Sequence, residues 1–399
     1  MLSLEDALSR IHAALDPLPS EALPVAASAG RILSAPLHAK VDLPAFDNSA
    51  MDGYAVRSAD VATASTGQPA QLRVIGEVPA GRAFSGELCE GQGIRIFTGS
   101  PLPHGADAVV MQEDTRRDGD TVTILEPARP FEHVRLRGED VRCGQQIGEP
   151  GTVVSPGMLN LFAAAGVAEL SVSRRPRVAL LATGDELCEA NASLAPGQIF
   201  ESNRGMLAEL VRRAGGDAEI MPLVADTLEA TRDALGKAFK EFDAVITSGG
   251  VSVGDHDHVK GAFESLGGSL DFWKVAIKPG KPFVFGRVNN GYLFGLPGNP
   301  VSAFVTFLLL VRPALLHWQG ARDRSLPIQS VTLGESLANR GDRRHFMRVR
   351  VGDDGVARSA GVQGSHMLHS LAVANALVDV PPGAELAAGS RTAALRFDF

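Results

Sequence analysis

Apolar runs from residue 177 onward predict buried strands, because they show no alternation with polar residues. The runs cover 177–183, 219–224, 243–247 and 291–298. Stretches with apolar residues at helical spacing separate several of these runs. Buried strands that alternate with helices are typical of a parallel sheet with helices on both faces. We therefore predict an α/β domain with a doubly wound, mostly parallel sheet.

The helices between these strands have recognisable ends. Residues 203–216 carry apolar positions at helical spacing and end at paired glycines. Asp226 is followed three residues later by Glu229, which predicts a capping box at the start of a helix over 227–242.

Two other apolar stretches have to be distinguished from targeting and membrane segments. Residues 3–18 place apolar residues on one helical face and acids in the first turn, whereas a secretory signal has a basic start and an unbroken apolar run. Residues 301–311 are too few to span a bilayer and are followed by Arg312 and Pro313. We predict an amphipathic helix at the first stretch and, at the second, a buried core helix stopped by Arg312 and Pro313. No membrane association is expected.

The two flanking regions show a different pattern. Residues from about 45 to 140 contain many glycines and prolines between short alternating runs such as 93–100. The tail after about residue 326 also alternates, as in 345–351. Because such runs between turn residues predict strands, we expect a strand-rich domain in the first region and a small β-barrel or sandwich in the tail.

Composition narrows the class of protein. A chain of 399 residues is too long for one core and predicts two to four domains. The formal net charge of −8 argues against a nucleic-acid-binding protein, which usually carries a basic face. The three cysteines show no CxxC spacing, so we expect reduced thiols in a cytoplasmic protein rather than a disulfide framework.

Polar residues gather where the predicted strands end, at 183–186, 226–227, 247–260 and 296–300. In open parallel sheets, ligands bind beyond the carboxyl ends of the strands. We therefore expect these four loops to share one crevice.

The loop 247–260 reads TSGGVSVGDHDHVK. Consecutive backbone N–H groups of a glycine-rich turn bind phosphate oxygens, which favours the stretch TSGGVSVGD as a phosphate cradle. The alternative is a tight turn that needs glycine only for its backbone conformation.

The same loop raises the question of a metal ion. An alternating run would give His256 and His258 one face and the aspartates the other, so each face has too few ligands for zinc. Carboxylates suit Mg²⁺ better, and Glu186, Asp226 and Asp257 lie on three of the crevice loops. As helix caps, any one of these acids would be unremarkable.

Two basic clusters are candidates for oxyanion binding. Lys274, Lys278 and Lys281 interrupt an apolar context, where ammonium groups suit an oxyanion substrate better than a solvated surface run. Arg348 and Arg350 share one face of a predicted strand, where a structural ion-pair ladder is an equally fair interpretation.

Seven motifs in this order resemble those of one family, the molybdopterin molybdenumtransferases of molybdenum-cofactor synthesis, which include the gephyrin E domain. The matching stretches are FDNSAMDGYAV (46–56), IFTGSPLP (96–103), RGED (137–140), ATGDEL (182–187), SGGVSVGDHDHVK (248–260), VAIKPGKPFVFG (275–286) and LPGNPVSAF (296–304). The related molybdopterin adenylyltransferases share some shorter motifs, but FDNSAMDGYA and the long flanks favour the transferase.

The resemblance implies insertion of molybdate into adenylylated molybdopterin with release of AMP and with Mg²⁺ as cofactor. It implies functional positions in the insert domain at Asp52, Thr98 and Asp140. It also implies a second set, around the cation and the adenylyl phosphate, at Glu186, Asp226 and Asp257. It also implies substrate-binding positions, which are Ser248, Gly249, Gly250, Lys274, Lys278, Lys281, Ser302, Arg348 and Ser365. The members of this set that would contact molybdate are Lys278, Lys281, Ser302, Arg348 and Ser365.

The resemblance also implies four domains and a homodimer. The expected parts are an α/β domain (1–20 and 174–325), an elongated linker domain (21–44 and 141–173), the insert domain (45–140) and a C-terminal barrel (326–399). Each active site would combine one protomer's α/β domain with its partner's insert domain. An adenylyltransferase acting on molybdopterin and ATP, and a scaffold protein with this fold, are the alternatives.

Overall fold

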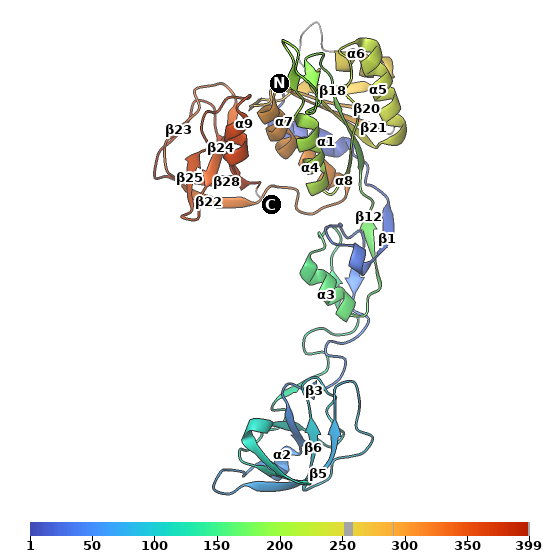
Figure 1. Ribbon diagram of the computed structural model, residues 1–399, viewed down its shortest axis with the longest axis vertical. Coiled ribbons are helices and arrows are strands. Elements are labelled where there is room, and N and C mark those ends of the chain that lie inside the picture. The colour runs from blue at the N-terminus through green and yellow to red at the C-terminus, as the bar shows by residue number, and fades with distance from the viewer. Residues whose placement is uncertain (251–257, 290, 398–399) are drawn as a thin grey trace.

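The protein is elongated, with two groups of elements at opposite ends and a narrow connection between them (Figure 1). The structure is a computed structural model that describes residues 1–250, 258–289 and 291–397. One end carries the α/β sheet and the C-terminal strands, and the other end carries a separate sheet from the first third of the chain (Figure 1).

The α/β domain contains a six-stranded sheet in the order β16-β13-β17-β21-β20-β18. These strands are β16 (Asp217–Ile220), β13 (Arg177–Ala182), β17 (Ala244–Ser248), β21 (Gly291–Leu296), β20 (Pro282–Val288) and β18 (Ser269–Lys274). The first three pairings are parallel and the last two are antiparallel. The predicted mostly parallel sheet is therefore confirmed, with an antiparallel edge.

Helices cover both faces of this sheet, as predicted. They are α1 (Leu4–Ala14), α4 (Asn203–Arg213), α5 (Leu228–Glu241), α6 (His258–Ser265), α7 (Pro300–Thr306) and α8 (Arg312–Trp318). Along β13, Val178 and Leu180 join the core cluster of α1, α4, α7 and α8, whereas Ala179 and Leu181 join the cluster of α5 and α6. Because successive side chains of a strand point to opposite faces, a strand buried on both faces needs an unbroken apolar run.

Three predicted boundaries are wrong, each for a local reason. The strand predicted over 219–224 is β16 and ends at Ile220, two residues before Pro222, which has no N–H to donate. The cap of α5 is Thr227 rather than Asp226, since the Thr227 side chain accepts a hydrogen bond from Ala230 N.

The third correction concerns the core helix, which does not stop at Arg312 and Pro313. A π-helical segment, Phe307–Val311, joins α7 to α8, and Pro313 lies in the first turn of α8. A π-helical turn shifts the hydrogen-bond register, so the missing N–H of proline is accommodated. The helix 300–318 is long and apolar enough to cross a membrane, but 83% of its apolar window is buried, which identifies it as a core helix.

The connection between the two ends is narrow. It contains the antiparallel pairs β1 (Ser20–Pro24) with β12 (Glu169–Ser173) and β2 (Leu37–His38) with β11 (Gln146–Gly148), together with α3 (Pro156–Ala164). Its own small core surrounds Phe162. These elements form an elongated linker from two separate stretches of the chain.

The far end consists mainly of a six-stranded sheet in the order β7-β4-β6-β5-β9-β8. Its strands are β4 (Gly53–Val56), β5 (Ala70–Val78), β6 (Gln92–Ile96), β7 (Ala108–Met111), β8 (Thr115–Asp118) and β9 (Thr121–Ile124). The short pair β3 (Asn48–Ser49) with β10 (Val134–Arg135) and the helix α2 (Ser58–Val61) complete this strand-rich insert.

The C-terminal strands form a closed barrel, as predicted. The strands are β22 (Ile328–Leu333), β24 (Arg344–Val351), β25 (Val356–Ser359), β26 (Ala376–Val380) and β28 (Arg391–Arg396), and pairing of β24 with β26 closes the ring. Met347 and Val349 lie in the barrel core, whereas Phe346 and Leu377 belong to the core of the α/β domain. The barrel and the α/β domain therefore pack as one unit.

Candidate active site

A cavity of about 650 Å³ lies at the carboxyl ends of β13, β17 and β21. Because β17 pairs in parallel with both neighbours, the loops that follow the three strands meet at one edge of the sheet. The cavity is lined, among others, by Thr183, Glu186, Phe200, Asn203, Ser248, Gly249, Gly250, Asn299, Pro300 and His366. Three of the four predicted loops line this cavity, and Glu186, Ser248, Gly249 and Gly250 lie in its wall, whereas residues 226–227 are not part of the lining.

The turn after β17 has the backbone of a phosphate cradle. Gly249 and Gly250 have φ of 91° and 66°, so two consecutive residues adopt the left-handed region. A Cβ at Gly250 would lie 2.7 Å from Val259 Cγ2 and 2.9 Å from Thr183 Oγ1. Glycine is therefore needed here for its φ and for the close packing of the turn against α6. Consecutive N–H groups in such a turn form a concave anion-binding surface.

Asn203 holds this cradle and was missed by the sequence prediction. Its buried side chain donates from Nδ2 to Ser248 Oγ (2.8 Å) and to Gly298 O (2.7 Å). Since a carbonyl can only accept, the Gly298 contact fixes the orientation of the amide. Asn203 therefore ties the start of α4 to two crevice loops. The sequence marked it only as the first residue of a helix.

A second missed group, Arg204, anchors the flap beside the cavity. The flap is the strand pair β14 (Leu187–Cys188) and β15 (Ile199–Phe200). The buried Arg204 donates to Glu201 Oε2 and to Glu189 Oε1, both at 2.8 Å. Glu201 Oε1 also accepts from the backbone N of Asn203 and Arg204 at 2.6 and 2.9 Å. The ion pairs thus connect the flap to the start of α4.

The structure describes two of the three predicted carboxylates, Glu186 and Asp226. The loops of Glu186 and Asp226 are neighbours, since Thr183 and Val224 form a parallel bridge and Asp226 N donates to Asp185 Oδ1 (3.0 Å). Asp257 lies outside the described residues, as does His256. Among residues 1–250, 258–289 and 291–397, no three His, Cys, Asp or Glu side chains are grouped to hold a metal ion.

The lysine loop lies between α7 and the barrel. Lys278 belongs to β19 (Ile277–Lys278), which pairs in parallel with β24, opposite His345. A Cβ at Gly280 would lie 2.3 Å from Thr306 Cγ2, so only glycine allows the loop to pack against α7. Ser302 on α7 is buried. This packing brings the loop of Lys278 and Lys281 to the helix that carries Ser302.

The C-terminal barrel domain contributes Ser365 and Arg348 to this region near α7. Val301 N donates to Ser365 O (3.2 Å), which joins the loop of Ser365 to the start of α7. Arg348 is fully buried on β24, where its Nε donates to Ser370 Oγ (3.0 Å). Its Nη2 donates to the carbonyls of Val362 and Gly364 at 2.9 and 3.1 Å.

Arg348 carries a positive charge without an acidic partner in the described part of the chain. It forms no ion pair there, and its buried Nη1 atom has no hydrogen-bond partner there. Burial lowers the pKa of the Arg348 guanidinium. The ion-pair ladder considered for Arg348 and Arg350 is therefore absent among these residues, which favours the oxyanion interpretation.

The pKa of His345 is affected by the same positive charges. Burial first, and then the neighbouring cations Lys278, Arg348 and Arg343, lower the pKa of the His345 imidazole to about 4. His345 is therefore neutral at pH 7 and adds no charge of its own. The cations near His345, which are Lys278, Arg343 and Arg348, therefore make a cationic region at the paired strands β19 and β24.

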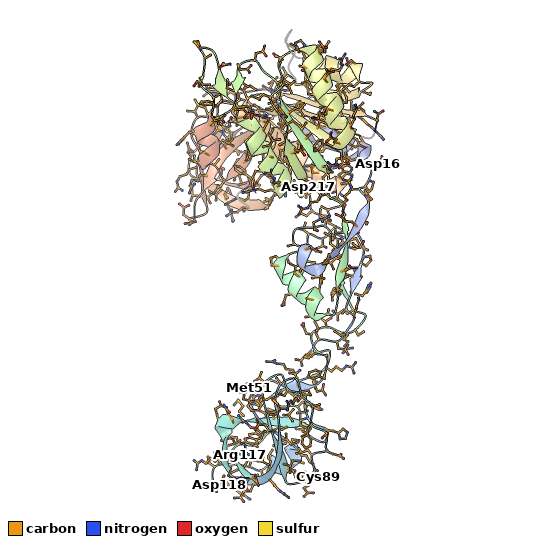
Figure 2. All side chains as sticks on the ribbon, turned by 45° about the vertical axis from the view of Figure 1, so that its right-hand side comes forward. Asp16, Met51, Cys89, Arg117, Asp118 and Asp217 are labelled. Carbon is orange, nitrogen blue, oxygen red and sulfur yellow. The ribbon has the colours of Figure 1, made fainter. Side chains whose placement is uncertain are left out.

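Two of the predicted residues of the insert domain, Asp52 and Thr98, form a separate hydrogen-bonded cluster. Asp52 Oδ1 accepts hydrogen bonds from Thr98 N and Thr98 Oγ1, both at 2.8 Å, and these bonds lower the pKa of the Asp52 carboxyl. Asp140 is exposed and its backbone N donates to Leu43 O (3.1 Å). The sticks view places Met51, the neighbour of Asp52, at the end of the insert that faces the linker (Figure 2). Within one chain, the linker separates this cluster from the cavity (Figure 1).

Comparisons with known proteins agree with this arrangement. Residues 2–166 match the family described as MoeA N-terminal region (domain I and II), residues 179–317 match the probable molybdopterin binding domain, and residues 330–397 match the MoeA C-terminal region (domain IV). A solved structure of the molybdopterin biosynthesis MoeA protein from Pyrococcus horikoshii has a TM-score of 0.85 and 30% identity, with full coverage of both chains.

Curated relatives match over nearly the whole chain. Molybdopterin molybdenumtransferase 2 of Mycobacterium tuberculosis is 41% identical over 376 residues, which cover 92% of this chain and 93% of that protein. Molybdopterin molybdenumtransferase of Haemophilus influenzae is 37% identical over 385 residues, covering 95% and 94%. The chain therefore belongs to the molybdopterin molybdenumtransferase family and is an enzyme of molybdenum-cofactor biosynthesis.

Proposed function

We propose that this enzyme inserts molybdate into adenylylated molybdopterin and releases AMP, with Mg²⁺ as cofactor, in the cytoplasm. One observation carries the proposal. The glycine cradle at Gly249 and Gly250 shares its cavity with Pro300 at the start of α7, and the turn at Gly280, between Lys278 and Lys281, packs against the same helix. The first suits a phosphate and the second suits an oxyanion, and the proposed reaction brings these two groups together.

The cationic region supports molybdate as the second substrate. Molybdate is a dianion, and the buried Arg348 lacks a carboxylate in the described part of the structure. An isolated buried charge is unfavourable, and an anionic substrate would compensate it. Lys278 and Lys281 would supply further N–H donors, while Ser302 and Ser365 would supply hydroxyl groups.

The cradle would bind the phosphates that join molybdopterin to the adenylyl group. Within the described residues Ser248 Oγ accepts from Asn203, and its hydroxyl proton would serve this role. Mg²⁺ would neutralise charge on the departing AMP phosphate. The residues proposed to hold it are Glu186, Asp226 and Asp257, with Glu186 in the cavity wall. Oxygen ligands of this kind suit Mg²⁺.

Asp52 would reach the cavity only from a second copy of the chain. Its cluster with Thr98 lies beyond the linker from the chain's own cavity (Figure 1). A homodimer in which each insert domain faces the partner's α/β domain would complete both sites by two-fold symmetry.

The decisive experiment measures AMP release from adenylylated molybdopterin, with and without molybdate and Mg²⁺. We expect release only when both are present, and we expect Asp257→Asn to fold normally but lose the stimulation by Mg²⁺. In the adenylyltransferase alternative, the purified protein would instead form adenylylated molybdopterin from ATP and molybdopterin. Wild-type turnover in Asp257→Asn would remove Asp257 from the metal set.

A further inference from the structure

The loop 277–281 carries Lys278 and Lys281, and both side chains are exposed. Its strand, β19, contains two residues, which pair in parallel with Arg344 and His345 of β24. A lysine carries its charge on a flexible stem with much rotamer freedom. The positions that the two ammonium groups can reach therefore depend on how firmly the backbone of this loop is held.

Arg343, the residue before β24, contacts this loop from the barrel domain. Its Nη1 donates to Ile277 O at 2.9 Å, and its side chain is 25% exposed. A hydrogen bond with a charged donor contributes more than one between neutral groups, particularly where water is partly excluded. This bond therefore joins the barrel to the loop through two residues that are 66 positions apart in the chain.

The acceptor of this bond belongs to the peptide group that leads into Lys278. The atoms of a peptide group lie close to one plane, so Ile277 O and the N and Cα of Lys278 move together. The Ile277 side chain is fully buried in the core of the α/β domain. On the far side of Lys278, Gly280 packs against Thr306. The hydrogen bond from Arg343 therefore fixes the peptide plane from which Lys278 extends.

Arg343 is itself held by the barrel. The buried Asn339 donates from Nδ2 to three backbone oxygens, which are those of Arg343 (2.8 Å), Val380 (2.9 Å) and Pro381 (3.0 Å). An ion pair with Asp342 adds little, because the Nε–Oδ1 distance is 3.6 Å and the Asp342 side chain is 84% exposed. The hydrogen bond to the loop, rather than this ion pair, therefore directs the guanidinium.

We propose that Arg343 is a positioning residue for the oxyanion substrate, which acts through the backbone of the lysine loop. The inference rests on the proposed function, in which Lys278 and Lys281 contact molybdate. Arg343 differs in this respect from Arg348, whose Nη1 has no hydrogen-bond partner among the described residues. Arg343 spends its donor on a backbone oxygen, so its effect on molybdate is indirect.

Hydrogen exchange of the full-length protein measures the hold on the loop directly. Arg343→Met removes the donor and the charge but retains an apolar stem. We expect amides within residues 275–283 to exchange about tenfold faster in this variant, because a charge-assisted hydrogen bond is lost. Arg350→Met is the matched control. Arg350 lies on the same part of the barrel, and its Nη1 donates to Val373 O (3.3 Å), so its loss should leave exchange in 275–283 unchanged.

The molybdate dependence of AMP release separates positioning from a general structural role. Arg343→Met should raise the half-saturating molybdate concentration by about five- to tenfold and change the maximal rate by less than about twofold. Arg343→Lys retains a charged donor and should recover most of the loss. In a Lys278→Ala, Lys281→Ala background, Arg343→Met should shift half-saturation by less than about twofold, because the groups that it positions are gone.

Three outcomes would overturn the inference. Unchanged exchange over 275–283 in Arg343→Met would show that the hydrogen bond does not hold the loop. An equal shift in half-saturation with and without the two lysines would mean that Arg343 contacts the oxyanion itself. Faster exchange with a normal molybdate response would remove the positioning role and leave the reaction untouched. A wild-type protein that releases no AMP would instead contradict the proposed function, and the exchange measurement would still decide whether Arg343 holds the loop.

Discussion

Arg348 is the residue whose environment most needs a substrate to explain it. A fully buried guanidinium normally has a carboxylate partner, yet Arg348 has only a hydroxyl and two carbonyls within the described residues. The sequence placed it on a strand, but it could not show burial or the lack of an acid. Its role could only be suggested from the family resemblance.

Lysine substitutions test the charge in this region. Lys278→Ala and Lys281→Ala should each raise the molybdate concentration needed for half-maximal AMP release by about tenfold or more, because each removes a charge-assisted contact to the oxyanion. Binding of the adenylylated pterin should change little. Lys237→Ala on α5, another exposed lysine, is the matched control. Equal loss of pterin affinity with a normal molybdate response would assign both lysines to the nucleotide side.

His345 predicts a pH dependence of stability. Its pKa is about 4 in the folded protein against 6.5 for an unperturbed imidazole. Between these values the unfolded chain binds more protons, so the contribution of His345 is complete above pH 6.5 and is lost as the pH falls toward 4. The loss should reach up to about 3 kcal/mol in the free energy of unfolding.

Urea unfolding from pH 7 to 4.5 measures this effect. His345→Gln should flatten the decline but not abolish it, because burial also lowers the pKa values of His12 and His317. A variant whose stability falls with pH as steeply as the wild type would show that His345 is not buried in its neutral form.

Among the elements of the fold, the turn at Gly249 and Gly250 tolerates little change in side-chain size or backbone conformation. Gly250→Ala should destabilise the protein by roughly 2–4 kcal/mol, since it adds a clash with Val259 to the strain of a positive φ. Gly267→Ala, at φ of 82° with no atom within 4 Å of its Cβ, carries the strain alone and should lose only about 1 kcal/mol. Thermal unfolding and AMP binding of both variants are the readouts, and equal losses would contradict the close packing of the turn.

Elements were predictable from sequence where one physical rule decided them. The run 177–183 predicted β13 because burial on both faces leaves no polar position. The cap of α5 and the continuation of the core helix through Pro313 were missed, because a neighbouring threonine and a π-helical segment decided them. Asn203 was missed because its partners, Ser248 and Gly298, are far away in the sequence.

At the scale of the whole molecule, the elongated shape limits which residues can meet. No local pattern in the sequence predicts the distance between the insert domain and the cavity, and only the resemblance suggested that they meet across a dimer. Asp52→Ala and Asp257→Ala should each be inactive as homodimers, because every site would then lack one required carboxylate.

A mixed dimer of these two variants separates the possible arrangements. With shared sites, one site carries both lesions and the other carries none, so a doubly tagged mixed dimer should recover about half of the wild-type activity. With sites built inside single chains, each site keeps one lesion. Absence of activity in a dimer whose exchange is verified by both tags would refute the shared site.

In the proposed reaction, molybdenum insertion and AMP release are one coupled event. The most direct test quantifies protein-bound or product-bound molybdenum and free AMP in the same reaction with adenylylated molybdopterin, molybdate and Mg²⁺. We expect the two amounts to rise together in equal proportion, and neither to rise without molybdate. AMP release that continues at the same rate without molybdate, or molybdenum incorporation without AMP, would contradict it.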